Sequence, residues 1–240
     1  MGEAKHLAKD SELPDPPKQD VLRVYGMKFS PFTHRLKLVL AAKGVEHETV
    51  NINLVSKPSW YLSKNHRGEV PVIEINGNII RDSIVTSQYV DDAYTGDKLT
   101  TTDPMKKAKE SVLLLDNEKT IRGFIEAAYH TPDKQARGLM IMKEGLEKID
   151  DFLKSTGSYF ICGDKPGLTD YMIWPHLERI RALWPICITQ FLFVEAYSRR
   201  MLRDSAVKQC QLPNSMHRRF AADCRKKKVN YDMVEEIEES

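Results

Sequence analysis

The sequence predicts an α+β protein in which a first domain of order β-α-β-α-β-β-α is followed by an all-helical bundle. Strand-like and helix-like patterns alternate through residues 21–95, as in a parallel β-α-β unit followed by a hairpin. Asn76-Gly77 separates two apolar runs, which is the strongest short-range signal for a β-hairpin. From residue 104 onward, helical periodicity continues with scarcely a strand-like run. The chain of 240 residues is long enough for two such domains.

The first-domain elements can be assigned in chain order. Residues 1–20 are polar and rich in proline, so we expect a flexible, extended arm there. We expect a strand at residues 21–26 and an amphipathic helix at 31–43, which Gly44 ends as a C-cap residue. A strand at 46–54, a short helix at 58–65, hairpin strands at 70–75 and 78–81, and a helix at 83–94 complete the domain, which spans residues 21–95.

The second domain is expected at residues 104–232, joined to the first through residues 95–103. Helical periodicity covers residues 104–130, 132–154, 168–183 and most of 189–228. Residues 233–240 form an acidic tail. No repeat of 20 to 50 residues is visible, which argues against a solenoid.

Composition limits the possible partners. The chain has 36 Lys and Arg against 34 Asp and Glu, a formal charge of +2, so no strong field favours nucleic acid or an anionic membrane. No apolar run approaches the roughly 20 residues needed to cross a bilayer, and no signal peptide is visible, so the expected compartment is the cytoplasm. The four cysteines are widely spaced and form no zinc-site pattern, which predicts neither disulfides nor a metal.

The most informative loop precedes the helix at residues 31–43. A helix N-terminus offers free N–H groups and the positive end of the helix dipole, which together stabilise an anion. Ser30 and Pro31 are equally well explained as an N-cap and a first helical residue. His34 and Arg35 are expected on the surface, and Tyr25 is expected to pack in the interior.

Two further loops carry ligand-type patterns. Val70-Pro71 opens an apolar strand, and a cis proline there would turn the backbone groups of the preceding residue outward. Asp82 and Ser83 stand between a strand and a helix, where they can cap N–H groups or receive an ammonium and a carboxylate. Each pattern alone is equally consistent with a structural role.

Together these motifs resemble the omega class of glutathione transferases, with its thioredoxin-like first domain. The resemblance covers residues 20–183 well and the last fifty residues poorly. It rests on Tyr25-x-Met27-x-Phe29-x-Pro31-Phe32, Asn51-Ile52-Asn53-Leu54, Lys57-Pro58-x-Trp60, Val70-Pro71-Val72, Asp82-Ser83, Thr169-Asp170-Tyr171-Met172-Ile173-Trp174-Pro175 and Glu178-Arg179.

The resemblance implies a glutathione site and a pocket for a second substrate. Ser30 would face the glutathione sulfur as the catalytic residue. The other glutathione-binding residues would be Phe32, which lines the site, Leu54 and Lys57 at the glycine end, Val70 and Pro71 on the backbone, and Asp82 and Ser83 at the γ-glutamyl group. Phe29, Pro31 and Arg179, with a segment around Tyr231, would border the second-substrate pocket.

Two positions depart from the omega pattern. Gly167 replaces a Ser or Thr cap, a minor change because Gly is an acceptable N-cap. Ser30 replaces the reactive cysteine, and serine cannot form the mixed disulfide of thiol transfer or dehydroascorbate reduction. A serine hydroxyl can instead donate a charge-assisted hydrogen bond to the glutathione thiolate, contributing about 1.5–3 kcal/mol.

The predicted function is therefore conjugation of glutathione to small electrophiles. One alternative is an enzyme that uses glutathione to reduce an oxidised substrate, by thiol transfer to mixed disulfides or by reduction of dehydroascorbate. A second is a non-catalytic protein that binds glutathione or apolar ligands. A third is a membrane-inserting relative of the intracellular chloride channels. The charged helix containing Arg35, Lys37 and Lys43 makes insertion costly. The resemblance also implies a homodimer, with an isologous contact between one subunit's first domain and the other's helical domain.

Overall fold

The computed structural model describes residues 5–234 and divides into two compact units. The first comprises the chain up to Gly96 together with Tyr231–Met233, and the second comprises Asp97–Asn230 with the chain from Val234. Most of the acidic tail expected at 233–240, residues 235–240, lies outside the described residues.

The first unit is built on a four-stranded sheet of order β2-β1-β3-β4. The strands are β1 (Leu22–Gly26), β2 (His47–Asn51), β3 (Val72–Ile75) and β4 (Asn78–Arg81). β1 pairs parallel with β2 and antiparallel with β3, which pairs antiparallel with β4. The expected β-α-β unit followed by a hairpin is confirmed.

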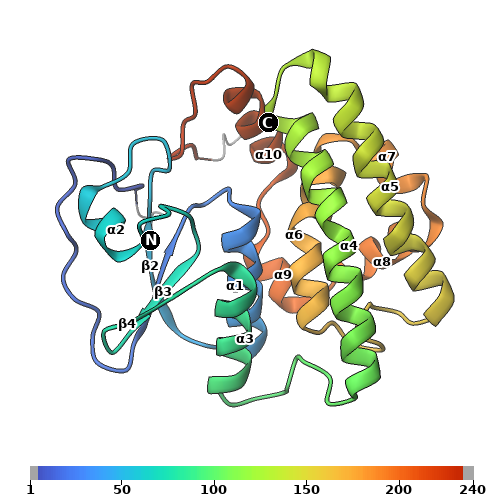
Figure 1. Ribbon diagram of the computed structural model, residues 1–240, viewed down its shortest axis with the longest axis horizontal. Coiled ribbons are helices and arrows are strands. Elements are labelled where there is room, and N and C mark those ends of the chain that lie inside the picture. The colour runs from blue at the N-terminus through green and yellow to red at the C-terminus, as the bar shows by residue number, and fades with distance from the viewer. Residues whose placement is uncertain (1–4, 235–240) are drawn as a thin grey trace, which may run out of the picture. The chain divides into compact units, whose positions relative to one another are not determined.

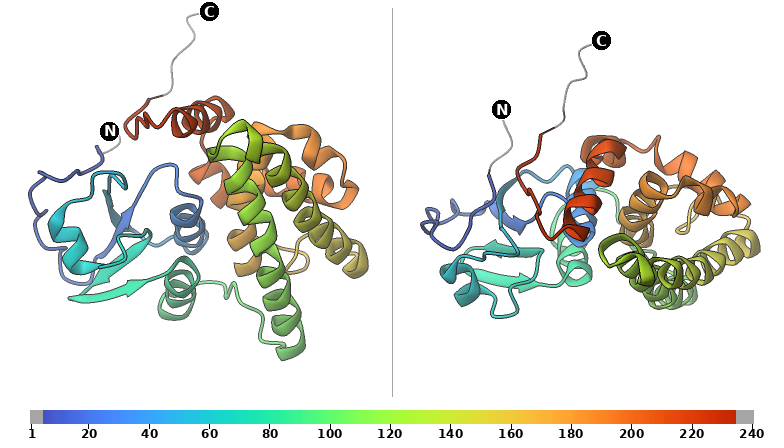
Figure 2. Two further views of the ribbon diagram at one scale, coloured as in Figure 1. Left: turned by 45° about the horizontal axis from the view of Figure 1, so that its top comes forward. Right: turned by 90° about the horizontal axis from the view of Figure 1, so that it is seen from above.

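Three helices cover this sheet. α1 (Pro31–Lys43) and α3 (Ser83–Ala93) pack side by side on one face, and α2 (Ser59–Lys64) lies on the other (Figures 1 and 2). α1 begins at the N-cap Ser30 and ends at Gly44, whose φ of 63° is the left-handed conformation that glycine adopts at no steric cost. The sheet and its helices place the three loops named above at one end of β1, β3 and β4.

Two residues of α1 are buried where the sequence analysis expected them on the surface. His34 and Arg35 are 4% and 2% exposed, so that expectation is wrong. The reason is that α1 packs against both the sheet and α3, which leaves only a narrow solvated stripe. Arg35 donates a hydrogen bond from Nη1 to Ser83 Oγ at 3.1 Å, and its guanidinium lies 5.1 Å from the centroid of the Phe32 ring.

Residues 5–20 run extended along the first unit and are attached to it by hydrogen bonds. Leu7 forms an isolated parallel bridge with Ile52. Further along, the Trp60 indole N–H donates to Ser11 O at 3.0 Å, and Arg23 Nη1 donates to Asp15 O at 2.6 Å.

The second unit contains seven helices within its described residues. They are α4 (Pro104–Tyr129), α5 (Pro132–Thr156), α6 (Leu168–Leu183), α7 (Pro185–Thr189), α8 (Leu192–Met201), α9 (Ser205–Cys210) and α10 (Asn214–Arg225). α4 and α5 run side by side (Figure 1) and approach closely at glycines: a Cβ on Gly123 would lie 2.3 Å from Met142 N. No described helix is long and apolar enough to cross a membrane.

The start of α6 depends on one buried carboxylate. Asp170 is fully buried and accepts hydrogen bonds from the backbone N–H groups of Ile161, Cys162 and Gly167 at 2.9, 3.1 and 2.9 Å. The helix begins after Gly167 as expected, although glycine has a second role there. A Cβ at Gly167 would lie 2.7 Å from both Leu99 O and Cys162 Cβ, so close packing excludes any larger residue.

Glu74→Gln is expected to destabilise the first unit in a pH-dependent way. Glu74 accepts hydrogen bonds from Tyr25 Oη and from Lys64 Nζ, the latter at 3.0 Å to each oxygen. Burial raises the pKa of Glu74, but these hydrogen bonds and the Lys64 charge outweigh burial and lower it. Because the pKa is lower in the folded protein, the stabilisation is present above the unfolded-state pKa and is lost as the pH falls through the folded-state pKa.

Urea unfolding at several pH values tests this expectation. At neutral pH the variant should lose about 1.5–3 kcal/mol of unfolding free energy. The difference from the unmodified protein should shrink as the pH falls through the lowered folded-state pKa of Glu74, because a protonated Glu74 carries no charge, like the glutamine of the variant. A difference that stays constant with pH would contradict the role of the carboxylate charge.

Candidate functional site

The three loops, together with the segment that carries Leu54 and Lys57, line a cavity of about 780 Å³ in the first unit, a size typical of sites for small organic ligands. It is lined by Ser30, Phe32, Leu54, Lys57, Asn65, Arg67, Gly68, Glu69, Val70, Pro71, Ile79, Ile80, Arg81, Asp82, Ser83 and Val85. The structure therefore brings together eight of the residues singled out from the sequence. Those eight come from four separate stretches of chain.

Ser30 lies at the N-terminus of α1, where it caps the helix. Its Oγ accepts a hydrogen bond from Thr33 N at 3.1 Å, and its own backbone N–H donates to Met27 O at 3.0 Å. A serine hydroxyl has one donor and two acceptor lone pairs, so accepting from Thr33 leaves the O–H proton for a ligand. The cap and the ligand-facing role are compatible in the same side chain.

The second wall is the loop that leads into β3, where the Val70–Pro71 peptide is cis. Two buried side chains hold the residue before it: Tyr61 Oη donates to Glu69 O at 2.6 Å, and Asn65 Nδ2 donates to the same oxygen at 2.8 Å. Because that carbonyl has two fixed donors, the backbone around Val70 is held at the cavity wall.

The third wall is the start of α3. Asp82 adopts a φ of 77°, a conformation that costs a non-glycine residue about 1–3 kcal/mol and tends to occur at functional sites. Its Oδ1 accepts from Ile84 N and Val85 N at 2.8 and 3.1 Å. Ser83 Oγ accepts from the buried Arg35, so its O–H proton, like that of Ser30, can be donated to a ligand.

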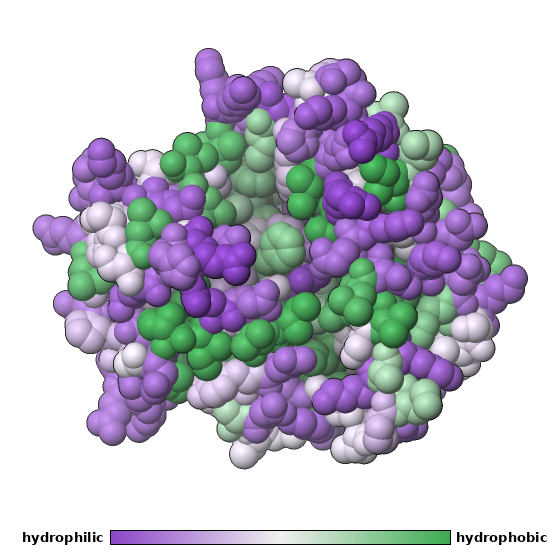
Figure 3. Space-filling view, in the orientation of Figure 1, coloured by the Kyte–Doolittle hydropathy of each residue, from purple (hydrophilic) through white to green (hydrophobic). Residues whose placement is uncertain are grey.

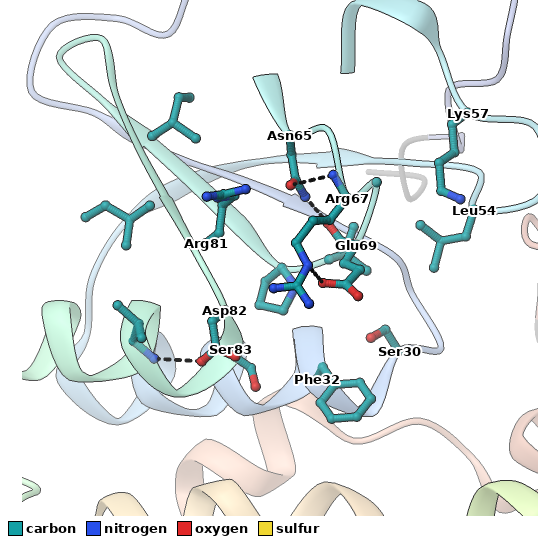
Figure 4. Close-up of a pocket in the computed structure, with 16 residues that line it drawn as sticks. Ser30, Phe32, Leu54, Lys57, Asn65, Arg67, Glu69, Arg81, Asp82 and Ser83 are labelled. Atoms are coloured by element: carbon teal, nitrogen blue, oxygen red, sulfur yellow. Dashed lines mark hydrogen bonds and ion pairs between the residues drawn. The ribbon is translucent and has the colours of Figure 1, made fainter. Parts of the chain in front are cut away.

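Figure 4 shows how these residues are arranged around the cavity. Leu54 and Lys57 lie at one end, Asp82 and Ser83 lie at the opposite end, and Ser30 and Phe32 lie at the helix start between them. The lining therefore has Lys57 at one end and Asp82 with Ser83 at the other, where Arg81 lies nearby.

Several lining residues were missed by the sequence analysis. Arg67 forms an ion pair with Glu69 at 3.3 Å, and Arg81 lies beside His66. Neither arginine belongs to a motif that marks a ligand site. With Lys57, the lining has three cations against the two carboxylates of Glu69 and Asp82, a net positive balance.

Three predicted site residues are not among those lining this cavity. Phe29 and Pro31 flank Ser30 and are buried, Phe29 being 1% exposed. Arg179 lies in α6 of the second unit, where it is 2% exposed, donates to Pro175 O at 2.7 Å and pairs with Glu178 at 3.3 Å. Tyr25 packs in the interior as expected, and burial raises its pKa.

Other chemistry on this chain is limited by burial. Burial raises the pKa of the thiols of Cys162, Cys187 and Cys224, the last to about 11, so these thiols are poor nucleophiles at neutral pH. Within residues 5–234, no group of three or more His, Cys, Asp or Glu side chains is arranged to hold a metal ion.

Known proteins resemble both halves of the chain. The family model of the glutathione S-transferase N-terminal domain matches residues 24–98, and that of the C-terminal domain matches residues 132–199. Glutathione S-transferase omega-1 of Sus scrofa is 35% identical over 209 residues, covering 86% of this chain and 87% of the relative. Pyrimidodiazepine synthase of Drosophila melanogaster is 31% identical over 245 residues and covers 98% of both.

A solved structure supports the fold. Glutathione transferase Omega 3C from Trametes versicolor has a TM-score of 0.72 and 22% identity, covering 87% of this chain and 91% of that chain. These findings, with the fold, define the class: the chain belongs to the glutathione S-transferase family. Within that family it is an omega-like glutathione transferase, so the resemblance seen in the sequence motifs is confirmed, and the family implies glutathione as co-substrate.

Proposed function

We propose that this protein conjugates glutathione to small electrophiles, with Ser30 stabilising the glutathione thiolate. The observation that carries the proposal is the Ser30 hydroxyl at the α1 N-terminus. It lines the cavity and accepts from Thr33 N, which leaves its proton for the ligand. A hydrogen bond to a thiolate contributes about 1.5–3 kcal/mol, which lowers the thiol pKa by about 1–2.

The ends of the cavity support one orientation of the tripeptide. Glutathione carries two carboxylates and one ammonium, and the lining offers one more cation than anion. Lys57 would receive the glycine carboxylate, and the carboxylate of Asp82 would receive the γ-glutamyl ammonium. Ser83 would donate to the γ-glutamyl carboxylate, while the Val70 backbone would hold the cysteinyl part near Ser30.

Titration of the protein with glutathione at several pH values tests this proposal. Thiolate absorbance should report a bound-thiol pKa below that of free glutathione, and Ser30→Ala should abolish the shift. The kcat/KM for a model aryl halide should fall roughly 10- to 100-fold, which is the free energy of the lost hydrogen bond expressed as a rate. Tight binding with an unshifted pKa would indicate a non-catalytic binding protein.

Thiol transfer and dehydroascorbate reduction are weaker candidates for this chain. The family resemblance implies that both reactions proceed through a mixed disulfide with a cysteine of the enzyme, which serine cannot form. Residues 1–161 contain no cysteine that could replace it. We therefore expect these activities to be weak.

The homodimer expected from the family has a candidate surface on α4. Met105, Val112 and Leu115 are 66%, 57% and 72% exposed and recur at helical spacing on one face. Figure 3 shows apolar surface over the middle of α4 among hydrophilic side chains. We expect a second copy of the chain to cover this face of α4. The expected compartment of the protein is still the cytoplasm.

Leu115→Glu is therefore expected to give a monomer. Burying a carboxylate in an apolar contact should raise the dimer dissociation constant by roughly 100-fold or more, as measured by light scattering over a dilution series. Ile186→Glu, at a position in α7 that is also 66% exposed, is the matched control and should leave the dimer intact. Equal effects of both substitutions, or a monomeric unmodified protein, would contradict this surface.

A further inference from the structure

A hydrogen-bonded histidine outside the cavity reaches the loop that carries Ser30. The His6 side chain is 1% exposed, and its Nε2 lies 3.2 Å from the backbone nitrogen of Lys28, two residues before Ser30. Its Nδ1 lies 2.7 Å from Asp232 Oδ1, which also accepts from His6 N at 2.8 Å. Asp232 lies 226 residues further along the chain than His6.

These partners assign the tautomer of His6. A backbone N–H can only donate, so Nε2 must carry the lone pair that accepts from Lys28. An ionised carboxylate can only accept, so Nδ1 must carry the proton. Burial raises the pKa of Asp232, but the hydrogen bonds from His6 outweigh burial and lower it, which keeps Asp232 ionised. The carboxylate thus holds the ring with Nε2 toward Lys28, in the way that a carboxylate bonded to one ring nitrogen orients the other.

The segment Tyr231–Met233 closes around the same point. The Tyr231 ring centroid lies 5.4 Å from that of His6, and Lys28 Nζ donates to Met233 O at 3.2 Å. Tyr231 and Met233 are 8% and 2% exposed, so the segment is buried against the first unit. His6 of the N-terminal arm and the segment Tyr231–Met233 therefore converge on Lys28.

The loop between β1 and α1 explains why this contact matters. The N–H of Met27 donates to Thr33 Oγ1, that of Phe29 to Met27 Sδ, and that of Ser30 to Met27 O, so these partners come from within six residues. The Lys28 N–H instead uses a partner 22 residues away. Lys28 is consequently a point at which the backbone of this loop is hydrogen-bonded to a distant part of the unit.

We propose that His6, oriented by Asp232, is a positioning residue that holds the Ser30 hydroxyl in place through Lys28. The proposal rests on the proposed function of Ser30, since it concerns where that hydroxyl is directed. Misplacement of a catalytic group by about 1 Å can cost up to about 10²-fold in rate. Loss of the His6–Lys28 bond should therefore reduce thiolate stabilisation without removing any residue that lines the cavity.

Two substitutions separate the two sides of the imidazole. The amide of His6→Gln reaches the place of Nε2 and can accept from Lys28, whereas that of His6→Asn reaches only the place of Nδ1 and can donate to Asp232. Ser11→Ala is the control, because Ser11 accepts from Ala8 N within the same arm and has no bond to the Ser30 loop. The three variants are compared with the unmodified protein by melting temperature, hydrogen exchange of the Lys28 amide, the thiol pKa of bound glutathione, and kcat.

We expect His6→Asn to speed exchange at Lys28, to raise the bound-thiol pKa toward that of free glutathione and to lower kcat roughly tenfold. His6→Gln and Ser11→Ala should stay close to the unmodified protein in exchange, in bound-thiol pKa and in kcat. The proposal would be overturned if His6→Asn and His6→Gln changed exchange and thiol pKa only in proportion to their loss of melting temperature. It would also be overturned if His6→Asn left exchange at Lys28 unchanged. An unshifted thiol pKa in the unmodified protein would contradict the function of Ser30, while exchange at Lys28 would still decide the link to His6.

Discussion

Ser30→Cys is expected to convert this protein from conjugation to glutathione-dependent thiol transfer. The introduced thiol would stand at the α1 N-terminus, where the Thr33 N–H now donates to Ser30 Oγ at 3.1 Å. Helix N-termini lower cysteine pKa values to about 3.5–7.5, so the introduced group would be largely thiolate at neutral pH. It could then attack the disulfide of a glutathionylated substrate, which releases the substrate thiol and leaves glutathione in a mixed disulfide with the introduced cysteine. A second glutathione would attack this mixed disulfide, release glutathione disulfide and regenerate the thiolate.

Two opposite changes should accompany the substitution. Reduction of a mixed disulfide or of dehydroascorbate should rise from background to steady turnover, whereas conjugation should fall roughly tenfold because a thiolate at position 30 has no proton to donate to the glutathione thiolate. The rate of alkylation by iodoacetamide against pH should reveal one new low-pKa thiol, since burial raises the pKa of Cys162, Cys187 and Cys224.

Ser30→Ala is the control that separates chemistry from fold. It should lose conjugation without gaining reduction, and its cap loss should cost only about 1 kcal/mol of stability. A Ser30→Cys variant that binds glutathione and carries a low-pKa thiol, yet reduces neither substrate, would show that the omega-like scaffold lacks another requirement for that reaction.

The predictability of the fold and of the site differed for physical reasons. Strand and helix periods, the Asn76-Gly77 turn and the Gly44 cap are local signals, and the structure confirms the elements that they predicted. His34 and Arg35 show the limit of such signals, because an apolar stripe indicates which side of α1 faces the sheet but not how much of the other side α3 covers. Burial of Arg35 is a tertiary effect of the α1–α3 contact.

The residues that line the cavity also divide into those that local sequence signals predict and those that they do not. Ser30, Val70, Pro71 and Asp82 follow or precede recognisable strand and helix ends, so their loops could be located from the sequence. Arg67 belongs to no such pattern and reaches the lining only because the chain after α2 folds back. The contact between His6 and Lys28 could not be predicted either, since it needs an arm and a distant terminal segment to meet.

Gly167 shows a further limit. Sequence reasoning treated it as an acceptable N-cap in place of a Ser or Thr. The structure shows that a Cβ there would lie 2.7 Å from Leu99 O, a contact that real Cβ atoms do not make. Close packing of backbone around a glycine leaves no trace in a single sequence.

Asp170→Ala is expected to cause the largest loss of stability among single substitutions in the second unit. The carboxylate is fully buried and accepts from three backbone N–H groups, those of Ile161, Cys162 and Gly167. Each buried N–H left without a partner costs about 1–3 kcal/mol, and the three together should cost about 4–5 kcal/mol after relaxation. That is a large fraction of the 5–15 kcal/mol that typically stabilises a domain.

Asp103→Ala is the matched control for this substitution. Asp103 also caps a helix with its carboxylate, accepting from Met105 N and Lys106 N at 2.9 and 3.2 Å, but it is exposed to solvent. Water can replace the lost acceptor there, so the expected cost is only about 1 kcal/mol. Urea unfolding followed by far-UV circular dichroism measures the stability loss of both variants. If Asp170→Ala does not fold, Asp170→Asn takes its place. It keeps one acceptor oxygen, and we still expect it to lose more stability than Asp103→Ala. Equal losses at Asp103 and Asp170 would show that burial of the N–H groups does not set the cost, and that the cap alone does.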